Sequence, residues 1–251
     1  MSFNLKAIHH VEPAFAGIDE SRGSEVHGVA FCMALESMEE LDRTERGYDK
    51  KMVTLHAYDG RSLEGFIYVN KPGLANAGDL EPSSRYLGVL VKGAKQAGLN
   101  PDYIAKLARH PVYKASPAAL KAREARPDPD TLKEITVEEL AQRQDWIGVL
   151  GYIVQTSSHF GSHKCRDITS RALMQFHGIP LDDNDDKGRP PYPLVQDLSE
   201  DELEFITNWL DHYELGPNDG DEKKPIVGYL KEFKEQQKSG CTTFALPPIP
   251  Q

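Results

Sequence analysis

The chain has 251 residues, of which 39% are hydrophobic and 27% charged, so most of it is expected to fold around a buried core. Its formal net charge of −10 argues against general nucleic-acid binding, because phosphate contacts require clustered Lys and Arg. The sequence lacks the long apolar run that a membrane span or a secretory signal needs, and its three cysteines (Cys32, Cys165 and Cys241) are far apart. We therefore expect a cytoplasmic protein with reduced thiols and no membrane partner.

The first 112 residues predict short strands interspersed with helices. Strands are expected at residues 3–8, 12–18, 26–35, 52–58 and 62–69. Helices are expected at residues 37–46, 83–97 and from Asn100-Pro101 to just before Pro111. The Asp59-Gly60 step indicates a tight hairpin between the last two strands, and Ser37 with Glu40 has the form of a helix capping box.

The composition changes after Tyr113. Residues 116–140 are rich in Ala, Pro and charge and predict a linker. Residues 141–215 predict a mainly helical extension that ends with an amphipathic helix at 199–213. The polar residues 216–251 predict a loosely ordered tail, apart from 227–237.

One carboxylate in the helix expected at 37–46 lies on the apolar face, where a charged group is unusual. On a helical wheel Glu45 falls between Met38 and Leu41, whereas Asp42 lies at the rim of that apolar face. Burial and the helix dipole both disfavour the ionised form of a carboxylate there. A carboxylate in such surroundings is suited to proton transfer. The alternative is that Glu45 reaches water at a frayed helix end, or pairs with Arg46 or Lys50.

The motifs around Glu45 resemble those of the gamma-glutamylcyclotransferases. That family has a V-x-G-V strand, a helix with L-D-x-x-E, a Gly-Tyr step, a P-S-x-x-Y segment and a G-A-x-x-x-G-L-P helix. The corresponding residues here are 26–29, 41–45, 47–48, 82–86 and 93–100, in the same order. The resemblance covers roughly residues 10–112.

The resemblance implies an α+β fold in which residues 1–115 form a small mixed β-barrel with flanking helices. It also implies release of 5-oxoproline from a gamma-glutamyl amino acid or peptide, an acyltransferase or lyase type of reaction in glutathione metabolism. Glu45 matches the family's general acid/base, and Tyr48 and Tyr86 match tyrosines that line its substrate pocket. No metal or cofactor is implied, and the expected partner is a small gamma-glutamyl molecule.

One family motif is missing from this sequence: the N-terminal Y-G-S-N-L turn, whose backbone amides bind the gamma-glutamyl group. We therefore expect the sequence to start at the family's second strand. Two functions therefore stay open: an enzyme in which another segment replaces the turn, such as residues 157–162, and a catalytically impaired binding or scaffold protein. An incomplete sheet edge also leaves a homodimer open.

The extension contains a second set of chemically capable residues. His159, His163 and Cys165, with His177 further on, include metal-ligand types, but Gly161 weakens the helix that would align them. A Cys165 nucleophile activated by His163 is the other reading. We expect neither, and we expect the extension to pack as structural helices.

Overall fold

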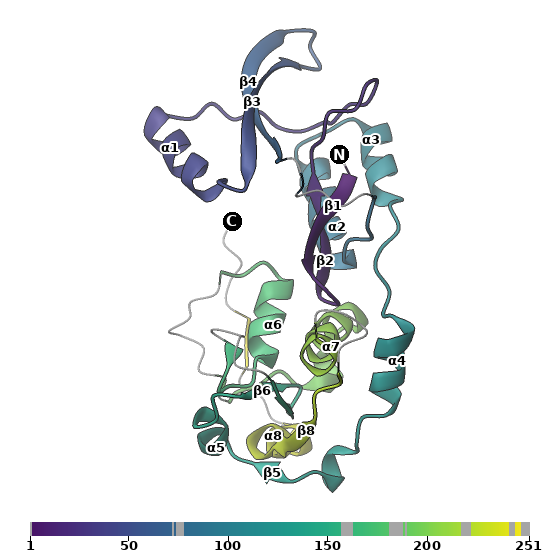
Figure 1. The fold of residues 1–251 in the computed structure, drawn as a ribbon, viewed down its shortest axis with the longest axis vertical. Helices are drawn as coiled ribbons and strands as arrows, with labels where there is room; N and C mark the ends of the chain where they lie inside the picture. Colours follow the sequence, from purple (N-terminus) through teal and green to yellow (C-terminus); the bar gives the residue numbers. More distant parts are fainter. Residues whose placement is uncertain are drawn as a thin grey trace. The chain divides into compact units, whose positions relative to one another are not determined.

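The computed structural model describes residues 2–71, 73, 78–156, 163–180, 188, 190–216, 222–240 and 244–246. The chain forms two compact units, coloured along the sequence in Figure 1. Unit 1 consists of Met1–Ile8 and Glu12–Tyr113, and unit 2 of His9–Val11 and Lys114–Gln251. The break at Tyr113 lies close to residue 115, where we expected the first domain to end. In the part of the chain just defined, no helix is both long and apolar enough to cross a bilayer.

Unit 1 contains two separate antiparallel pairs of strands. β1 (Ser2–Ile8) pairs with β2 (Glu12–Gly17), and β3 (Tyr48–His56) pairs with β4 (Ser62–Asn70) in register from Tyr48↔Asn70 to His56↔Ser62. Gly60 occupies the hairpin turn with a φ of 88°, a conformation that glycine adopts without strain. The fold of unit 1 is therefore mixed α and β as expected, whereas the described strands do not form a closed barrel.

Two capped helices form the core of unit 1 with the first strand pair. They are α2 (Ser84–Gln96) and α3 (Pro101–Ala108). The Asn100 side chain accepts hydrogen bonds from the first turn of α3, which confirms the predicted helix start. The buried residues of this core come from β1, β2 and the α2–α3 pair: Phe3, Ala14, Leu87, Ala94, Leu99 and Leu107.

The strand predicted at 26–35 is wrong. Residues 26–34 adopt no strand or helix, and the Phe31 side chain is 78% exposed. α1 (Leu35–Thr44) begins two residues earlier than predicted. Its N-cap is Ala34, which makes no side-chain hydrogen bond, so the predicted Ser37–Glu40 capping box is also wrong. β-branched and aromatic content favours a strand only where a neighbouring strand supplies backbone hydrogen bonds, and no described residue does so here.

Unit 2 is built on a mixed four-stranded sheet in the order β5-β8-β7-β6. Its strands are β5 (Glu134–Ile135), β6 (Trp146–Val149), β7 (Tyr152–Gln155) and β8 (Ile226–Leu230). Its helices are α4 (Pro117–Glu124), α5 (Val137–Ala141), α6 (Thr169–Phe176), α7 (Glu200–Leu215) and α8 (Lys231–Ser239), with 3-10 turns η1 (Pro129–Thr131) and η3 (Val195–Asp197). Only β5 and β8 run parallel. The extension thus has the helices that we expected, together with a sheet that we did not predict.

The sheet draws on a segment that we expected to be a linker and on the stretch 227–237, which we expected to be ordered within the tail. The predicted linker 116–140 contains α4, β5 and α5. The predicted tail contains β8, an inner strand of the sheet, and α8, whose Phe233 side chain is fully buried; both lie within or next to the stretch 227–237. The helix predicted at 199–213 is confirmed as α7, which starts with a Ser199–Glu202 capping box.

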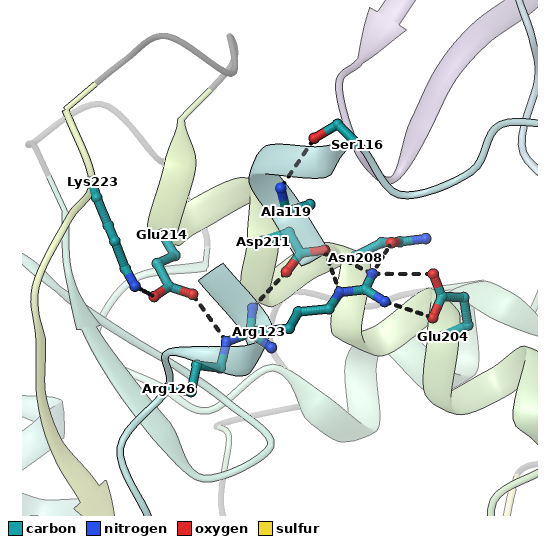
Figure 2. A network of polar contacts seen from close by, with 9 residues as sticks. All are labelled: Ser116, Ala119, Arg123, Arg126, Glu204, Asn208, Asp211, Glu214 and Lys223. Atoms are coloured by element: carbon teal, nitrogen blue, oxygen red, sulfur yellow. Dashed lines mark hydrogen bonds and ion pairs between the residues drawn. The ribbon is translucent and has the colours of Figure 1, made fainter. Parts of the chain in front are cut away.

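A buried ion network joins α4 to α7 (Figure 2). Arg123 donates to Asp211 at 2.9 and 2.7 Å and to Glu204 at 2.9 and 3.0 Å. Arg126 donates to Asp211 at 2.5 Å and to Glu214 at 2.9 Å. The Asp211 and Glu214 side chains are fully buried, so each of these carboxylates depends on its cationic partners for the solvation that water would otherwise supply.

A glycine in the β6–β7 turn is required by both its conformation and its neighbours. Gly151 has a φ of +78°, and a Cβ atom there would lie 2.6 Å from Tyr229 and 2.8 Å from Phe233. We expect Gly151→Ala to lower the free energy of unfolding of unit 2 by about 1–3 kcal/mol from overpacking, in addition to backbone strain. Urea unfolding followed by tryptophan fluorescence measures this, because both tryptophans, Trp146 and Trp209, belong to unit 2.

The matched control is Gly178→Ala. Gly178 also has a positive φ, +70°, but nothing lies within 4 Å of the added Cβ. Gly178→Ala introduces the backbone strain without the steric clash. It should lower the free energy of unfolding clearly less than Gly151→Ala does. Equal losses would show that packing against Tyr229 and Phe233 is unimportant.

Candidate active site

Glu45 lies at the end of α1, on the helix face that the sequence predicts. It is the C-cap residue, and its backbone N–H donates to the Leu41 carbonyl at 2.9 Å. The half-buried residues 38, 41, 42 and 45 share this face, whereas the other residues of 35–46 are exposed. The orientation of Glu45 thus agrees with the helical wheel, but α1 buries no residue fully, so the apolar surroundings that we expected are shallower.

A cluster of polar side chains surrounds this end of α1. The Tyr68 hydroxyl on β4 donates to Asp42 Oδ1 at 2.5 Å, and Lys50 Nζ on β3 donates to Asp42 Oδ2 at 2.9 Å. The hydrogen bond to Asp42 raises the pKa of Tyr68 to about 12, and the Glu45 carboxylate adds to this electrostatically. The Tyr68 and Lys50 hydrogen bonds together hold the pKa of Asp42 below its ordinary range.

The two tyrosines expected in a substrate pocket lie in different elements of unit 1. Tyr48 opens β3, and its backbone N–H donates to the Glu45 carbonyl at 2.9 Å. The Tyr86 hydroxyl on α2 accepts a hydrogen bond from the Ala16 N–H at 3.3 Å, and its ring packs edge-on against Phe15. Burial, with smaller effects of Glu12 and Tyr48, raises the pKa of Tyr86. The structure therefore brings Tyr48 next to Glu45 along the chain and within electrostatic reach of Tyr86.

Tyr86 retains one donor for a ligand. The Ala16 N–H occupies an acceptor position on the Tyr86 oxygen. Among the residues that the structure describes, no acceptor contacts the Tyr86 O–H. A phenol with this arrangement can donate a hydrogen bond to a carboxylate of a bound molecule.

A buried carboxylate near Tyr86 was missed by the sequence reasoning. Glu12, the first residue of β2, is only 2% exposed and accepts hydrogen bonds from Ser83 Oγ and, at 2.8 Å, from Arg85 Nη1. Burial raises the pKa of Glu12 despite these two partners. Ser83 also caps α2 by accepting the Tyr86 N–H at 3.0 Å, so Glu12 helps to fix the turn that carries Tyr86. No local pattern could have found this contact, because Glu12 and Ser83 are 71 residues apart.

Glu12 should make unit 1 less stable as the pH rises. Its folded-state pKa lies above the ordinary value of 4.5, so its contribution is fully present below pH 4.5 and is lost as the pH rises through the folded-state pKa. We therefore expect Glu12→Gln to gain stability relative to the wild type between pH 4.5 and pH 7. Urea titrations at both pH values, followed by amide NMR signals of α2, measure the difference. A difference that stays constant with pH would contradict the raised pKa.

The candidate residues in unit 2 each have a separate partner. His163 Nδ1 lies 2.5 Å from the Tyr213 hydroxyl, the Cys165 thiol lies 3.4 Å from the Arg143 carbonyl, and His177 Nε2 lies 2.6 Å from Glu202. Within the described ranges, no three His, Cys, Asp or Glu side chains gather as metal ligands would. His159 and the segment 157–162, which we considered as a replacement for the missing turn, lie outside the described residues, as does Cys241.

Part of the chain is similar to known proteins. Residues 25–107 match the AIG2-like family, and this range includes Asp42, Glu45, Tyr48, Tyr68 and Tyr86. The chain is 26% identical over 123 residues to the gamma-glutamyl cyclotransferase gliK of Claviceps purpurea, a match that covers 45% of this chain and 55% of the relative. The chain thus spans about half the length of this curated relative.

Two solved structures are also similar. One is an uncharacterized protein from Homo sapiens, with 24% identity and a TM-score of 0.40 over 46% of this chain and 70% of that one. The other is a gamma-glutamyl cyclotransferase, with 23% identity and a TM-score of 0.37 over 50% of this chain and 78% of that one.

Proposed function

We propose that this chain releases 5-oxoproline from a gamma-glutamyl amino acid or peptide, because residues 25–107 match the AIG2-like family and the chain is similar to a gamma-glutamyl cyclotransferase. The substrate's own α-amine attacks its γ-carbonyl carbon and closes a five-membered ring. A C–N bond forms within the ring, the C–N bond to the leaving amine breaks, and no oxidant or water is consumed. The attack is intramolecular, so the protein has to orient the substrate and transfer a proton.

Glu45 is the proposed general acid/base. Its carboxylate accepts the proton that the attacking amine loses and returns it to the departing nitrogen. The observation that carries this assignment is its position, half-buried at the end of α1. Among the described residues no side chain forms a hydrogen bond or ion pair with the Glu45 carboxylate. Arg46 and Lys50 are cationic residues near Glu45 in the sequence, and neither pairs with it. The Glu45 carboxylate is therefore available to a substrate amine.

Tyr48 and Tyr86 are the proposed substrate-binding residues. The unused O–H of Tyr86 supports a hydrogen bond to a substrate carboxylate. Tyr48 follows Glu45 by three residues, and its backbone N–H donates to the Glu45 carbonyl, which supports a place for its phenol near the proposed base. In this proposal the substrate carboxylate binds Tyr86 and the substrate amine binds Glu45.

The reaction predicts which product appears and which substrates fail. Purified chain is incubated with gamma-glutamyl amino acids and with the same compounds carrying an acetylated α-amine, and 5-oxoproline and glutamate are separated by chromatography. We expect 5-oxoproline from the free amines and no turnover of the acetylated ones, because the blocked nitrogen cannot attack. Release of glutamate from both sets would indicate hydrolysis by water and would contradict the proposal.

A further inference from the structure

We infer that Asp42 and Tyr68 are positioning residues for Glu45, an inference that rests on the proposed function. Asp42 receives hydrogen bonds on both carboxylate oxygens, from Tyr68 on β4 and from Lys50 on β3. It precedes Glu45 by three residues on α1, so the two side chains share one helix face. Asp42 thereby joins the helix that carries Glu45 to both strands of the β3–β4 hairpin.

Apolar packing alone does not fix α1. None of its residues is fully buried, Leu35 is 79% exposed, and Met38 and Leu41 are only half-buried. Core helices are normally held by an amphipathic face against a buried core, and α1 lacks such a core. The polar contacts of Asp42 therefore carry much of the task of fixing where α1 lies on the hairpin.

The same contacts keep competing groups away from Glu45. Lys50 could neutralise a nearby carboxylate, but its ammonium binds Asp42 and lies over the Phe66 ring at 4.7 Å. The Tyr68 proton is also directed to Asp42, although the Glu45 charge is near enough to act on the phenol. Among the described residues the Tyr68 hydroxyl contacts the Asp42 carboxylate at 2.5 Å and the Met38 sulfur at 3.8 Å, so the shorter contact to Asp42 takes the donor. Glu45 remains unpaired for the substrate amine.

A structural role alone does not explain this cluster. Asp42 and Lys50 are partly exposed, with side-chain exposures of 41% and 27%, and ion pairs in such positions contribute little to stability. Catalysis is far more sensitive, because a misplacement of about 1 Å can lower a rate by about 100-fold. Loss of the Asp42–Tyr68 hydrogen bond should therefore change turnover much more than unfolding.

The test compares Tyr68→Phe and Asp42→Asn with the control Lys51→Gln. Lys51 follows Lys50 on β3 and pairs with Glu20, so the control removes an ion pair from the same strand without touching α1. We expect kcat for 5-oxoproline release to fall by about 10- to 100-fold in Tyr68→Phe and Asp42→Asn, with KM changed less than about twofold. We also expect faster hydrogen exchange of the backbone amides of 35–44 in both variants. The control should change neither quantity.

Two readouts keep this inference separate from the proposed function. If the wild type releases no 5-oxoproline, the proposed function fails, and hydrogen exchange alone then decides whether Asp42 and Tyr68 fix α1. Faster exchange of 35–44 in the two variants supports the positioning role in that case. Unchanged exchange in 35–44 overturns it, and so does unchanged kcat in an active enzyme.

Discussion

Replacing Glu45 by Gln should lower kcat for 5-oxoproline release by about 10²- to 10⁴-fold, the range expected when a general acid/base is lost. Gln has nearly the same shape as Glu but cannot accept the proton of the attacking amine. Because α1 buries no residue fully, the substitution should leave the fold intact. Steady-state kinetics with a gamma-glutamyl amino acid measure the effect, and circular dichroism checks the fold.

The matched control for this substitution lies on the same helix. Glu39 is exposed on α1, away from the face that carries Glu45, and its side chain has no role in the proposed reaction. Glu39→Gln changes the net charge by the same amount and should keep kcat within about twofold, as surface substitutions usually do. Equal losses in both variants would mean that the effect comes from charge in general and not from a proton transfer by Glu45.

The largest expected loss of stability is in unit 2. Asp211→Asn should lower the free energy of unfolding by about 3–5 kcal/mol, because it removes the shared anionic partner of two largely buried guanidinium groups. Arg123 and Arg126 both donate to Asp211, whose side chain is fully buried (Figure 2). Urea unfolding followed by tryptophan fluorescence reports on unit 2 alone.

The control for Asp211 is another carboxylate of the same network. Glu204 also binds Arg123, with its side chain 50% exposed, so water can replace it. Glu204→Gln should cost less than about 1 kcal/mol. A loss from Glu204→Gln as large as that from Asp211→Asn would show that burial of the ion pair does not determine its contribution.

The parts of the fold that were predicted correctly depend on local signals. The Asp59-Gly60 hairpin, the Asn100-Pro101 start of α3 and the Ser199–Glu202 capping box are each specified by a few adjacent residues. The strand predicted at 26–35 failed because the presence of a partner strand is a property of the whole fold, and no described strand pairs with this segment. β8 nearly coincides with the start of the stretch 227–237 that we expected to be ordered, but its place inside a sheet was not predicted. The strand is five residues long, and its neighbours β5 and β7 are distant in sequence.

The candidate site divides in the same way. The face of α1 that carries Glu45 follows from helical periodicity, so the wheel located it. The Asp42–Tyr68 and Glu12–Ser83 contacts join residues 26 and 71 positions apart, and neither leaves a local pattern. The helical wheel placed Asp42 only at the rim of the apolar face. A wheel describes one helix alone, so it could not show the β3–β4 hairpin that Asp42 binds.

The most direct measurement is the amount of 5-oxoproline that the intact chain releases from a panel of gamma-glutamyl compounds. The panel should include gamma-glutamyl amino acids, glutathione and a gamma-glutamyl-lysine side-chain amide, because the leaving groups differ while the attacking amine is the same. The proposed function predicts release from at least one of them by the wild type, and loss of that release in Glu45→Gln. No release from any of them by the folded wild-type chain, or equal release by both proteins, would contradict it.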